Sequence, residues 1–183
     1  MGFFNGLRSE KAKGLAYLLS GLFLVCLFIG WRFYNARILS FKTDNVSASS
    51  ESQSSNPVSI NIPSIGLTLP LEESAIVDGV WQISYKGASH LDKSADPGET
   101  GNMVIYGHNK TSLFGPIRWL KEGDLIEIKN EEGALYSYRV VKTVITTPAD
   151  IEYVLPKSEE ILTLYTCTGL LDSKRHIVLA KRA

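Results

Sequence analysis

Cys167 is the residue of this 183-residue chain that is best suited to covalent chemistry. It ends the apolar run 161–166 and precedes Thr168-Gly169, a pair typical of a loop. A strand end that leads into a loop is where a rigid scaffold presents a reactive group. A cysteine acts as a nucleophile through its thiolate, and acyl transfer then needs a partner that moves protons. The competing interpretation is a buried structural cysteine, which is common.

Three histidines are candidates for that partner. His108 ends another apolar run and is followed by a polar turn, so we expect it at a strand terminus like Cys167. His90 lies in a predicted loop, where the ordinary interpretation is a solvated histidine. His176 follows Arg175 within one predicted strand, and alternation sends the two side chains to opposite faces, so only one of them can face the cysteine.

Arg175 is the candidate for stabilising negative charge on a reacting oxygen. It begins the final apolar run eight residues after Cys167, across a loop that contains Gly169 and Asp172. Two adjacent antiparallel strands joined by that loop would bring the two residues close. Arginine is always charged and offers a planar fork of donors. The alternative is a surface salt bridge to Asp172, and spacing alone leaves a Cys-His-Arg site as a hypothesis that needs geometry.

Short β-rich runs separated by turns dominate the second part of the chain. One segment, Thr111–Lys121, has helical spacing of its apolar residues and an early proline. Many short strands with little helix predict an all-β domain, either a closed or nearly closed β-barrel or a sandwich. The eight predicted strands are Ile60–Ile62, Leu67–Leu71, Trp81–Tyr85, Met103–His108, Leu125–Lys129, Tyr136–Val144, Ile161–Cys167 and Arg175–Ala180.

An apolar run near the N-terminus predicts a membrane anchor. Leu15–Trp31 contains no charged residue over 17 positions, which is the short end of the roughly 17–25 residues that a membrane-spanning helix needs. A cleaved signal peptide is the alternative, but its apolar part is normally about 7–15 residues and ends at a small-residue cleavage site. No convincing site follows the run, so we expect an uncleaved single-pass transmembrane helix over residues 15–31.

The basic residues near this span fix its orientation only weakly, because three precede it and three follow it. A large folded domain follows the span, and such domains are translocated largely regardless of charge. We therefore expect residues 1–14 in the cytoplasm and the domain outside the cell membrane. Thr43–Pro57 contains six serines and almost nothing apolar, so residues 32–57 are predicted to form a polar flexible stalk.

The folded domain is predicted over residues 58–183. It carries 13 basic and 16 acidic residues, and this mildly acidic balance gives no reason to expect a nucleic-acid partner.

Several motifs resemble one known family. The ending T-L-Y-T-C (163–167), followed by Arg175, resembles the sortase signature T-L-x-T-C followed by an arginine. The stretch P-G-E-T-G-N-M-V-I-Y-G-H-N (97–109) resembles the strand that carries the sortase histidine. The stretches L-F-G-P-I-R-W-L-K-E-G-D-L-I-E-I (113–128) and I-N-I-P-S-I-G-L (60–67) are similar to other parts of sortase domains. The resemblance runs from Ile60 to Ala180 in the family's order.

This resemblance implies an eight-stranded β-barrel, which agrees with the eight predicted strands. It implies that Cys167 is the nucleophile, His108 the general acid/base and Arg175 the oxyanion-stabilising or substrate-holding residue. It also implies that Thr166 helps to line the substrate groove, and it aligns His90 with a loop that is not catalytic.

The implied activity is that of a membrane-anchored cysteine transpeptidase. Such an enzyme cleaves a Leu-Pro-x-Thr-Gly-like sorting signal of a secreted surface protein and transfers the acyl group to an amine, either a cell-wall precursor or a pilin lysine. No metal or organic cofactor is required. Some sortases respond to calcium, and Glu152, Glu159 and Glu160 are conceivable ligands, although solvated surface acids are the preferred interpretation.

The chain also departs from the family, because little room between Tyr136 and Ile161 is left for a long substrate-gripping loop. Residues 147–155 are the expected groove wall, and their shortness leaves the exact sorting motif open. Two alternatives stay open at this point. One is another exported cysteine enzyme such as an L,D-transpeptidase, although that family has Ser-His-Gly-Cys around its cysteine. The other is a non-catalytic anchored β-barrel used for binding.

Overall fold

The computed structural model describes residues 3–36, 39–41 and 56–183. It divides into two compact units, Met1–Arg37 and Ile38–Ala183. The first unit holds one helix, α1 (Phe3–Ala36), and its part Lys13–Trp31 is long and apolar enough to cross a membrane by length and composition. Apolar side chains of that part, such as Leu22 and Phe23, are exposed. The helix is thus compatible with the predicted anchor and extends beyond it at both ends.

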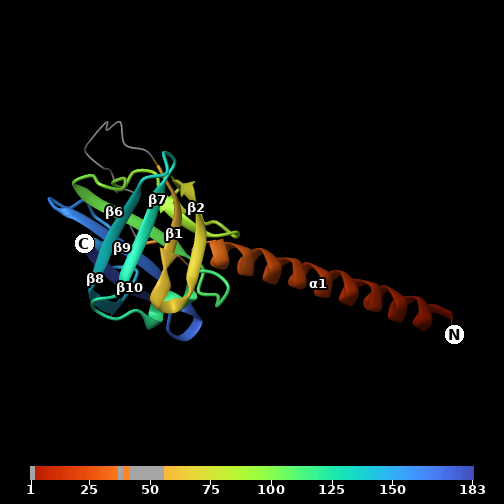
Figure 1. The fold of residues 1–183 in the computed structure, drawn as a ribbon. Coiled ribbons are helices and arrows are strands. Elements are labelled where there is room, and N and C mark those ends of the chain that lie inside the picture. The colour runs from red at the N-terminus through yellow and green to blue at the C-terminus, as the bar shows by residue number, and fades with distance from the viewer. Residues whose placement is uncertain (1–2, 37–38, 42–55) are drawn as a thin grey trace. The chain divides into compact units, whose positions relative to one another are not determined.

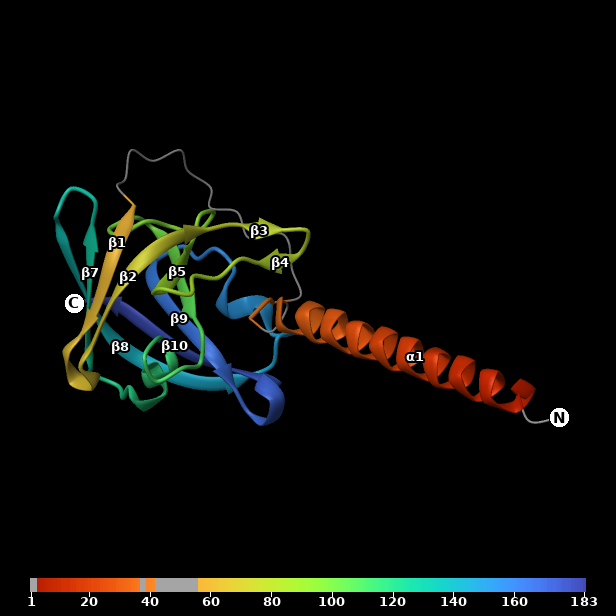
Figure 2. The same ribbon diagram turned by 90° about the vertical axis from the view of Figure 1, so that its right-hand side faces the viewer.

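The second unit is a closed barrel of eight strands, as predicted (Figures 1 and 2). Neighbouring strands pair antiparallel except for β2 with β5 and β6 with β9, which are parallel. In order around the barrel the strands are β1 (Pro57–Ile62), β2 (Leu67–Ser74), β5 (Ala88–Leu91), β6 (Gly101–Gly107), β9 (Glu160–Thr168), β10 (Lys174–Arg182), β8 (Leu135–Thr146) and β7 (Leu125–Asn130), and β7 closes on β1.

Short elements connect these strands. A separate two-stranded sheet is formed by β3 (Ile76–Val77) and β4 (Val80–Trp81). The described part of this unit also contains four 3-10 turns, namely η1 (Pro63–Ile65), η2 (Gly115–Trp119), η3 (Ile151–Tyr153) and η4 (Leu170–Asp172). The helix predicted over Thr111–Lys121 is therefore only the five-residue η2, which begins next to Pro116.

Seven of the eight predicted strands lie in the barrel, and the eighth prediction was wrong. Of Trp81–Tyr85, only Trp81 is in a strand, and that strand is outside the barrel. The eighth barrel strand is instead β5, which sequence analysis assigned to a loop. All four residues of β5 are buried although two of them are polar, so hydrophobicity alone does not reveal the strand.

His90 lies on β5 and is 1% exposed, so its interpretation as a solvated loop residue was wrong. Its Nδ1 is 2.7 Å from a carboxylate oxygen of Glu73, and its Nε2 is 3.1 Å from both the Ala95 carbonyl and the Ser94 hydroxyl. These partners satisfy both ring nitrogens, as burial of a polar group requires. The role of His90 is therefore to tie β5 to β2 and to the following loop.

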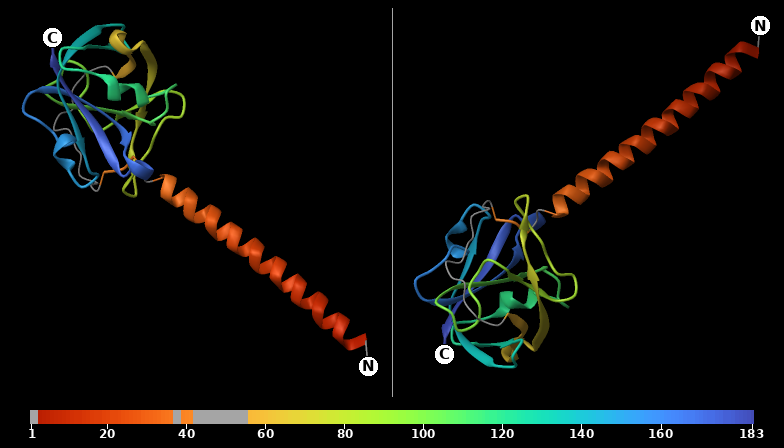
Figure 3. Two further views of the ribbon diagram at one scale, coloured as in Figure 1. Left: turned by 90° about the horizontal axis from the view of Figure 1, so that it is seen from below. Right: turned by 90° about the horizontal axis from the view of Figure 1, so that it is seen from above.

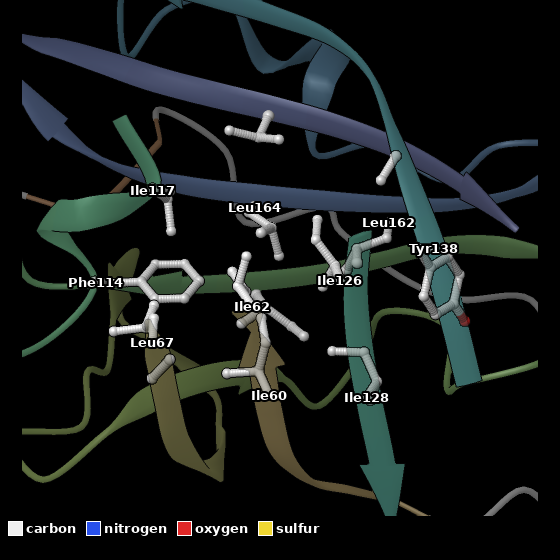
Figure 4. Packing of buried hydrophobic residues seen from close by; sticks show 14 of the residues in the cluster. Ile60, Ile62, Leu67, Phe114, Ile117, Ile126, Ile128, Tyr138, Leu162 and Leu164 are labelled. Atoms are coloured by element: carbon white, nitrogen blue, oxygen red, sulfur yellow. The ribbon is translucent and has the colours of Figure 1, made fainter. Parts of the chain in front are cut away.

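The barrel interior is filled by an apolar cluster, here called the inner cluster (Figure 4). Its members come from every barrel strand and from the segment around η2, whose Phe114 and Ile117 pack with residues such as Ile62 and Leu67. The strands surround this interior in both views of Figure 3. The inner cluster is made of Ile60, Ile62, Leu67, Leu69, Leu71, Ala88, Met103, Ile105, Leu113, Phe114, Ile117, Leu120, Ile126, Ile128, Tyr138, Val140, Leu162, Leu164, Val178 and Ala180.

A second buried cluster, here called the outer cluster, covers the opposite face of β6, β9 and β10. The alternation along β9 separates the two clusters, since Leu162 and Leu164 face inward whereas Tyr165 and Cys167 face outward. The outer cluster is made of Leu39, Phe41, Trp81, Leu91, Val104, Tyr106, Val154, Tyr165, Cys167 and Ile177. The candidate nucleophile thus lies on a covered outer face of the barrel.

Candidate active site

Three adjacent strands bring the predicted site residues together. Arg175 of β10 pairs directly with Cys167 of β9. Gly107 of β6 pairs with Thr166 of β9, so the next residue, His108, comes level with Cys167 on the other side. Neighbouring strands are about 4.8 Å apart, and residues at one level of a sheet face the same side. The register therefore sets the thiol of Cys167 between an imidazole and a guanidinium.

Cys167 is 1% exposed, and this burial governs its protonation. Burial raises the pKa of the Cys167 thiol to about 12, since a desolvated thiolate is costly; the positive charge of Arg175 opposes the shift and Asp172 adds to it. At neutral pH the site in this state therefore holds a protonated thiol, and the thiolate forms only when a base accepts the thiol proton.

His108 is held at the end of β6 by close packing and a hydrogen bond. Gly107 permits the packing, because a Cβ at that position would lie 2.6 Å from the Cβ of Phe114. The hydroxyl of Thr166 donates to the Gly107 carbonyl at 2.8 Å. On the exposed side, the ring of Tyr85 lies 4.9 Å from the imidazole, centroid to centroid. The imidazole is thus positioned by β6 on one side and by the loop that carries Tyr85 on the other.

The pKa of His108 is lowered from its ordinary value, first by burial and then by the charge of Lys110, while Asp172 acts in the opposite direction. Within the described residues, its Nε2 atom is buried and has no hydrogen-bond partner. A neutral imidazole with an unsatisfied nitrogen can accept a proton from a nearby acid and, as the imidazolium, can then donate it to a departing group.

Arg175 is 2% exposed, which rules out the alternative of a surface residue. Its Nη1 donates to the backbone carbonyls of Asp172 and Lys174, at 3.0 and 3.1 Å. Its Nη2 donates to the backbone carbonyl of Ser40 at 3.1 Å. One contact from the β9–β10 connection and one from the first residue of β10 therefore hold one end of the guanidinium, while the other end binds the Ser40 carbonyl.

Thr166, predicted to line a substrate groove, is fully buried and alternates with Cys167 along β9. Its observed contact is the hydrogen bond to Gly107 next to His108. In the structure Thr166 links β9 to the end of β6. Its role in substrate binding stays a prediction.

The floor around Cys167 is aromatic. Tyr106 and Tyr165 stack with centroids 5.1 Å apart and an angle of 8° between their planes. Trp81 packs edge-on against both, at 5.4 and 5.9 Å. Phe41 completes the set, 5.0 Å from Tyr165 and 5.7 Å from Trp81. These four rings are buried together in the outer cluster, and they form the apolar surroundings of the Cys167 thiol.

The segment predicted as a groove wall, residues 147–155, is fastened to the barrel by Asn102. This buried side chain donates to the carbonyls of Tyr153 and Leu155, at 2.9 and 3.0 Å, and accepts from the hydroxyl of Thr163 at 2.7 Å. Val154 is fully buried in the outer cluster. The wall is therefore a fixed part of the same face as Cys167.

Two of the three acidic residues considered for calcium have other partners. Glu159 pairs with Lys181 at 2.6 Å, and Glu160 accepts a hydrogen bond from Tyr138 at 2.8 Å. In the part of the chain that the structure describes, no group of three or more His, Cys, Asp or Glu residues is arranged to hold a metal ion.

Comparison with known proteins agrees with this geometry. The family model described as the Sortase domain matches residues 60–183, which is well over half of the chain. The chain belongs to the sortase family. Sortase A of Bacillus anthracis is 34% identical over 123 residues, which cover 65% of this chain and 56% of that relative. The matched region thus spans little more than half the length of that relative.

Solved sortases share the fold. The Sortase D5 transpeptidase of Clostridium perfringens has a TM-score of 0.60 and 28% identity, covering 70% of this chain and 79% of that one. Sortase C of Clostridium perfringens, solved with the C-terminal cell wall sorting motif, has a TM-score of 0.58 and 25% identity, covering 70% and 72% of the two chains. These similarities show that the second unit has the fold of solved sortases.

Sequence analysis missed two contributors to the site. Tyr85 was assigned to a strand, whereas it lies in a loop against the imidazole of His108. Leu39 and Phe41 were assigned to the polar stalk, whereas both are buried in the outer cluster to which Cys167 belongs. The only sequence signal for the second was the presence of apolar residues just ahead of the serine-rich stretch. Residues 42–55, the rest of that stretch, lie outside the described residues.

Proposed function

We propose that this sortase is a membrane-anchored cysteine transpeptidase that cleaves sorting-signal peptides and passes their acyl group to an amine. The observation that carries the proposal is the register of β6, β9 and β10, which sets His108 and Arg175 on either side of Cys167. Family membership supports the same reaction, since a solved relative is described as a transpeptidase and another was solved with a cell wall sorting motif.

The first half-reaction is the formation of a thioester. The Cys167 thiol gives its proton to His108, and the thiolate attacks the carbonyl carbon of the threonine in a Leu-Pro-x-Thr-Gly-like peptide. Arg175 donates to the oxyanion that develops on that carbonyl. The bond from threonine to glycine then breaks, and the imidazolium of His108 protonates the departing glycine amine.

The second half-reaction reverses these roles. An incoming amine attacks the thioester carbonyl and transfers a proton to His108, and the carbon–sulfur bond breaks to give a new amide. The proton then returns to the Cys167 thiolate. The acceptor is a cell-wall precursor amine or a pilin lysine. The proton balance needs only the residues of this chain.

The direct test uses the full chain in detergent, a peptide of the Leu-Pro-x-Thr-Gly type and a short glycine-based amine, with mass spectrometry as the readout. We expect a peptide thioester on Cys167 and an amide product with the amine. Cys167→Ala should abolish both, and Cys26→Ala, which removes the helix cysteine, should change neither. Peptide capture without bond cleavage would instead indicate a non-catalytic binding barrel.

The proposed location is the cell membrane, with α1 as a single-pass anchor and the barrel on the outside. It rests on the apolar part of α1 and on family membership. An epitope tag at the C-terminus should be detected by antibody on intact cells. Detection only after the membrane is lysed would contradict this orientation.

A further inference from the structure

An exposed aromatic ring covers the imidazole of His108. The ring centroids of Tyr85 and His108 are 4.9 Å apart, and their planes make an angle of 40°. Tyr85 is 73% exposed, whereas the Nε2 atom of His108 is buried. The aromatic ring therefore lies between the candidate acid/base and the solvent.

The β4–β5 loop, residues 82–87, holds this ring through contacts to buried polar groups. The hydroxyl of Tyr106 on β6 donates to the first carbonyl of the loop. Directly before Tyr85, the backbone amide of Ser84 donates to the hydroxyl of Ser89 at 2.8 Å, and both serines are buried. The backbone on the N-terminal side of Tyr85 is thus fixed to β5 and to the strand that ends at His108.

The other end of the loop is fixed by close packing. A Cβ at Gly87 would lie 2.1 Å from the carbonyl oxygen of Pro70 on β2, so a larger residue does not fit there. The hydroxyl of Ser74, also on β2, donates to the Ser89 hydroxyl at 2.9 Å. An exposed side chain that is held by a buried network over an acid/base has the arrangement of a functional residue with its supporting shell.

A covered imidazole matters most after the thioester has formed. Either an amine or a water molecule can attack the thioester carbonyl carbon and give a proton to His108. The carbon–sulfur bond then breaks, the proton passes to the Cys167 thiolate, and the product is an amide in the first case and a free acid in the second. A site that excludes water protects such an intermediate from hydrolysis.

The cover acts more strongly on water than on an amine. Water attacks well only when a base accepts its proton during the attack, so it has to form a hydrogen bond to the imidazole. The buried Nε2 of His108 does not offer this contact to solvent. The nitrogen of a neutral amine is the stronger nucleophile, so it attacks the carbonyl first and gives up its proton afterwards.

We propose that Tyr85 selects the acceptor by keeping water from His108, so that the thioester passes to an amine, and that Ser89 is the positioning residue that holds Tyr85 in place. The proposal rests on the proposed function of Cys167 and His108. It assigns to the β4–β5 loop the choice between transfer and hydrolysis.

The test measures the ratio of amide to free acid that the full chain in detergent forms from one Leu-Pro-x-Thr-Gly-type peptide at a fixed concentration of a short glycine-based amine. Mass spectrometry reads both products. We expect Tyr85→Ala to lower the ratio about three- to tenfold, a range comparable to the contribution of one aromatic pair. Tyr85→Phe, which keeps the ring, should retain the parental ratio.

The ratio separates acceptor choice from the orientation of His108, because the same imidazole and the same thioester serve both products. The matched control is Trp119→Ala, which removes a 58% exposed ring on η2 and should keep the parental ratio. An unchanged ratio in Tyr85→Ala, with both products formed more slowly, would mean that Tyr85 only orients His108, and it would overturn the proposal. An equal fall in Trp119→Ala would overturn it as well.

Ser89→Ala tests the support of the loop, since it removes the acceptor of the Ser84 amide. It should lower the ratio in the same direction as Tyr85→Ala but by less. A parental ratio in folded Ser89→Ala, with folding checked by thermal unfolding, would refute the positioning role of Ser89. A parent chain that forms no thioester would refute the proposed function itself, whereas a thioester with equal ratios in parent and Tyr85→Ala would refute the acceptor choice alone.

Discussion

Arg175 and Cys167 face each other directly across the β9–β10 ladder, and the arginine is as deeply buried as the cysteine. The guanidinium of Arg175 donates to the backbone carbonyls of Asp172, Lys174 and Ser40. A buried donor fork aimed at the space beside a thiol is suited to an oxyanion, since preorganised donors lose little on reorganisation.

The first prediction is that Arg175→Lys lowers kcat by about 10²–10³, with a larger loss for Arg175→Ala. Loss of one oxyanion donor has an effect of this size in other enzymes, about 3–4 kcal/mol. Lysine keeps the charge but not the planar fork that contacts three carbonyls at once. Steady-state kinetics of peptide cleavage would show it. A rise in KM with constant kcat would mean that Arg175 only holds the peptide.

The control for this prediction is His176→Gln. His176 is the neighbour of Arg175 on β10 and pairs with Thr166 rather than Cys167, so strand alternation turns it away from the thiol. Its variant should keep kcat within about threefold. Thermal unfolding of all three variants would separate a catalytic loss from a loss of folded protein.

The second prediction concerns pH. Burial raises the pKa of the Cys167 thiol to about 12. Below that pH, the thiolate fraction therefore grows about tenfold for each unit by which the pH is raised. The rate of alkylation of Cys167 should therefore rise with a slope near one in log rate from pH 7 to pH 10. The lowered pKa of His108 keeps its imidazole neutral in this range.

If the resting enzyme held a thiolate–imidazolium pair, the rate of Cys167 alkylation would instead be flat around neutral pH. His108→Ala separates the two cases. With a neutral imidazole at rest, this variant should lose peptide cleavage but alkylate at nearly the parental rate at pH 8. A large drop in its alkylation would show that His108 ionises the thiol before substrate binds.

The third prediction is that Tyr85 positions His108. The side chain is 73% exposed, yet its loop is fixed, because the Ser84 hydroxyl accepts from the amides of Lys86 and Gly87 at 3.1 and 3.0 Å. An aromatic pair of this kind contributes about 0.5–1.5 kcal/mol. Tyr85→Ala should thus lower kcat up to about tenfold, while Tyr85→Phe, which keeps the ring, should be close to the parent.

A structural effect of Tyr85 would look different. Since the ring is exposed, Tyr85→Ala should leave thermal unfolding unchanged, and it should speed modification of His108 by diethylpyrocarbonate. Equal losses in Tyr85→Phe and Tyr85→Ala would assign the role to the hydroxyl instead of the ring.

The sequence predicted the strands that carry the site because these are local patterns. The runs that end at His108 and Cys167 are apolar over six or seven residues, and the short loop before Arg175 allows only a hairpin. The register of β9 and β10 then follows because the two strands are consecutive in the chain and pair with each other. The parallel pairing of β6 with β9, which brings His108 level with Cys167, follows from no local pattern and was not predicted.

What the sequence did not reveal depends on distant partners. β5 is a buried strand because Glu73 and Ala95 satisfy His90 and because Ser89 bonds the Ser74 hydroxyl at 2.9 Å. Phe41 is buried because the rings of Trp81 and Tyr165, from two other segments, pack against it. The local composition and periodicity around His90 and Phe41 do not reveal these partners.

The last prediction concerns Asn102, which connects β6 to the groove wall. Replacing it by alanine leaves the carbonyls of Tyr153 and Leu155 without their donors and the Thr163 hydroxyl without its acceptor. Unsatisfied groups of this kind cost about 1–3 kcal/mol. For a unit of this size we expect thermal unfolding of the full chain to shift down by roughly 3–10 °C.

The same change should act on substrate binding more than on chemistry. Asn102 is remote from Cys167 in the strand register, since it lies at the far end of β6 opposite Ile161. The groove wall that it holds, in contrast, places Val154 in the outer cluster. We therefore expect Asn102→Ala to raise KM for the donor peptide with kcat within about twofold.

Thr163→Val is the matched comparison, because it removes only the third hydrogen bond and leaves both wall contacts in place. It should destabilise by about 1 kcal/mol and leave KM unchanged. In the double variant the Thr163 change should have a smaller effect than it does alone, since its partner is already absent. An equal rise of KM in Thr163→Val and Asn102→Ala would mean that general loss of stability, and not the attachment of the wall, controls peptide binding.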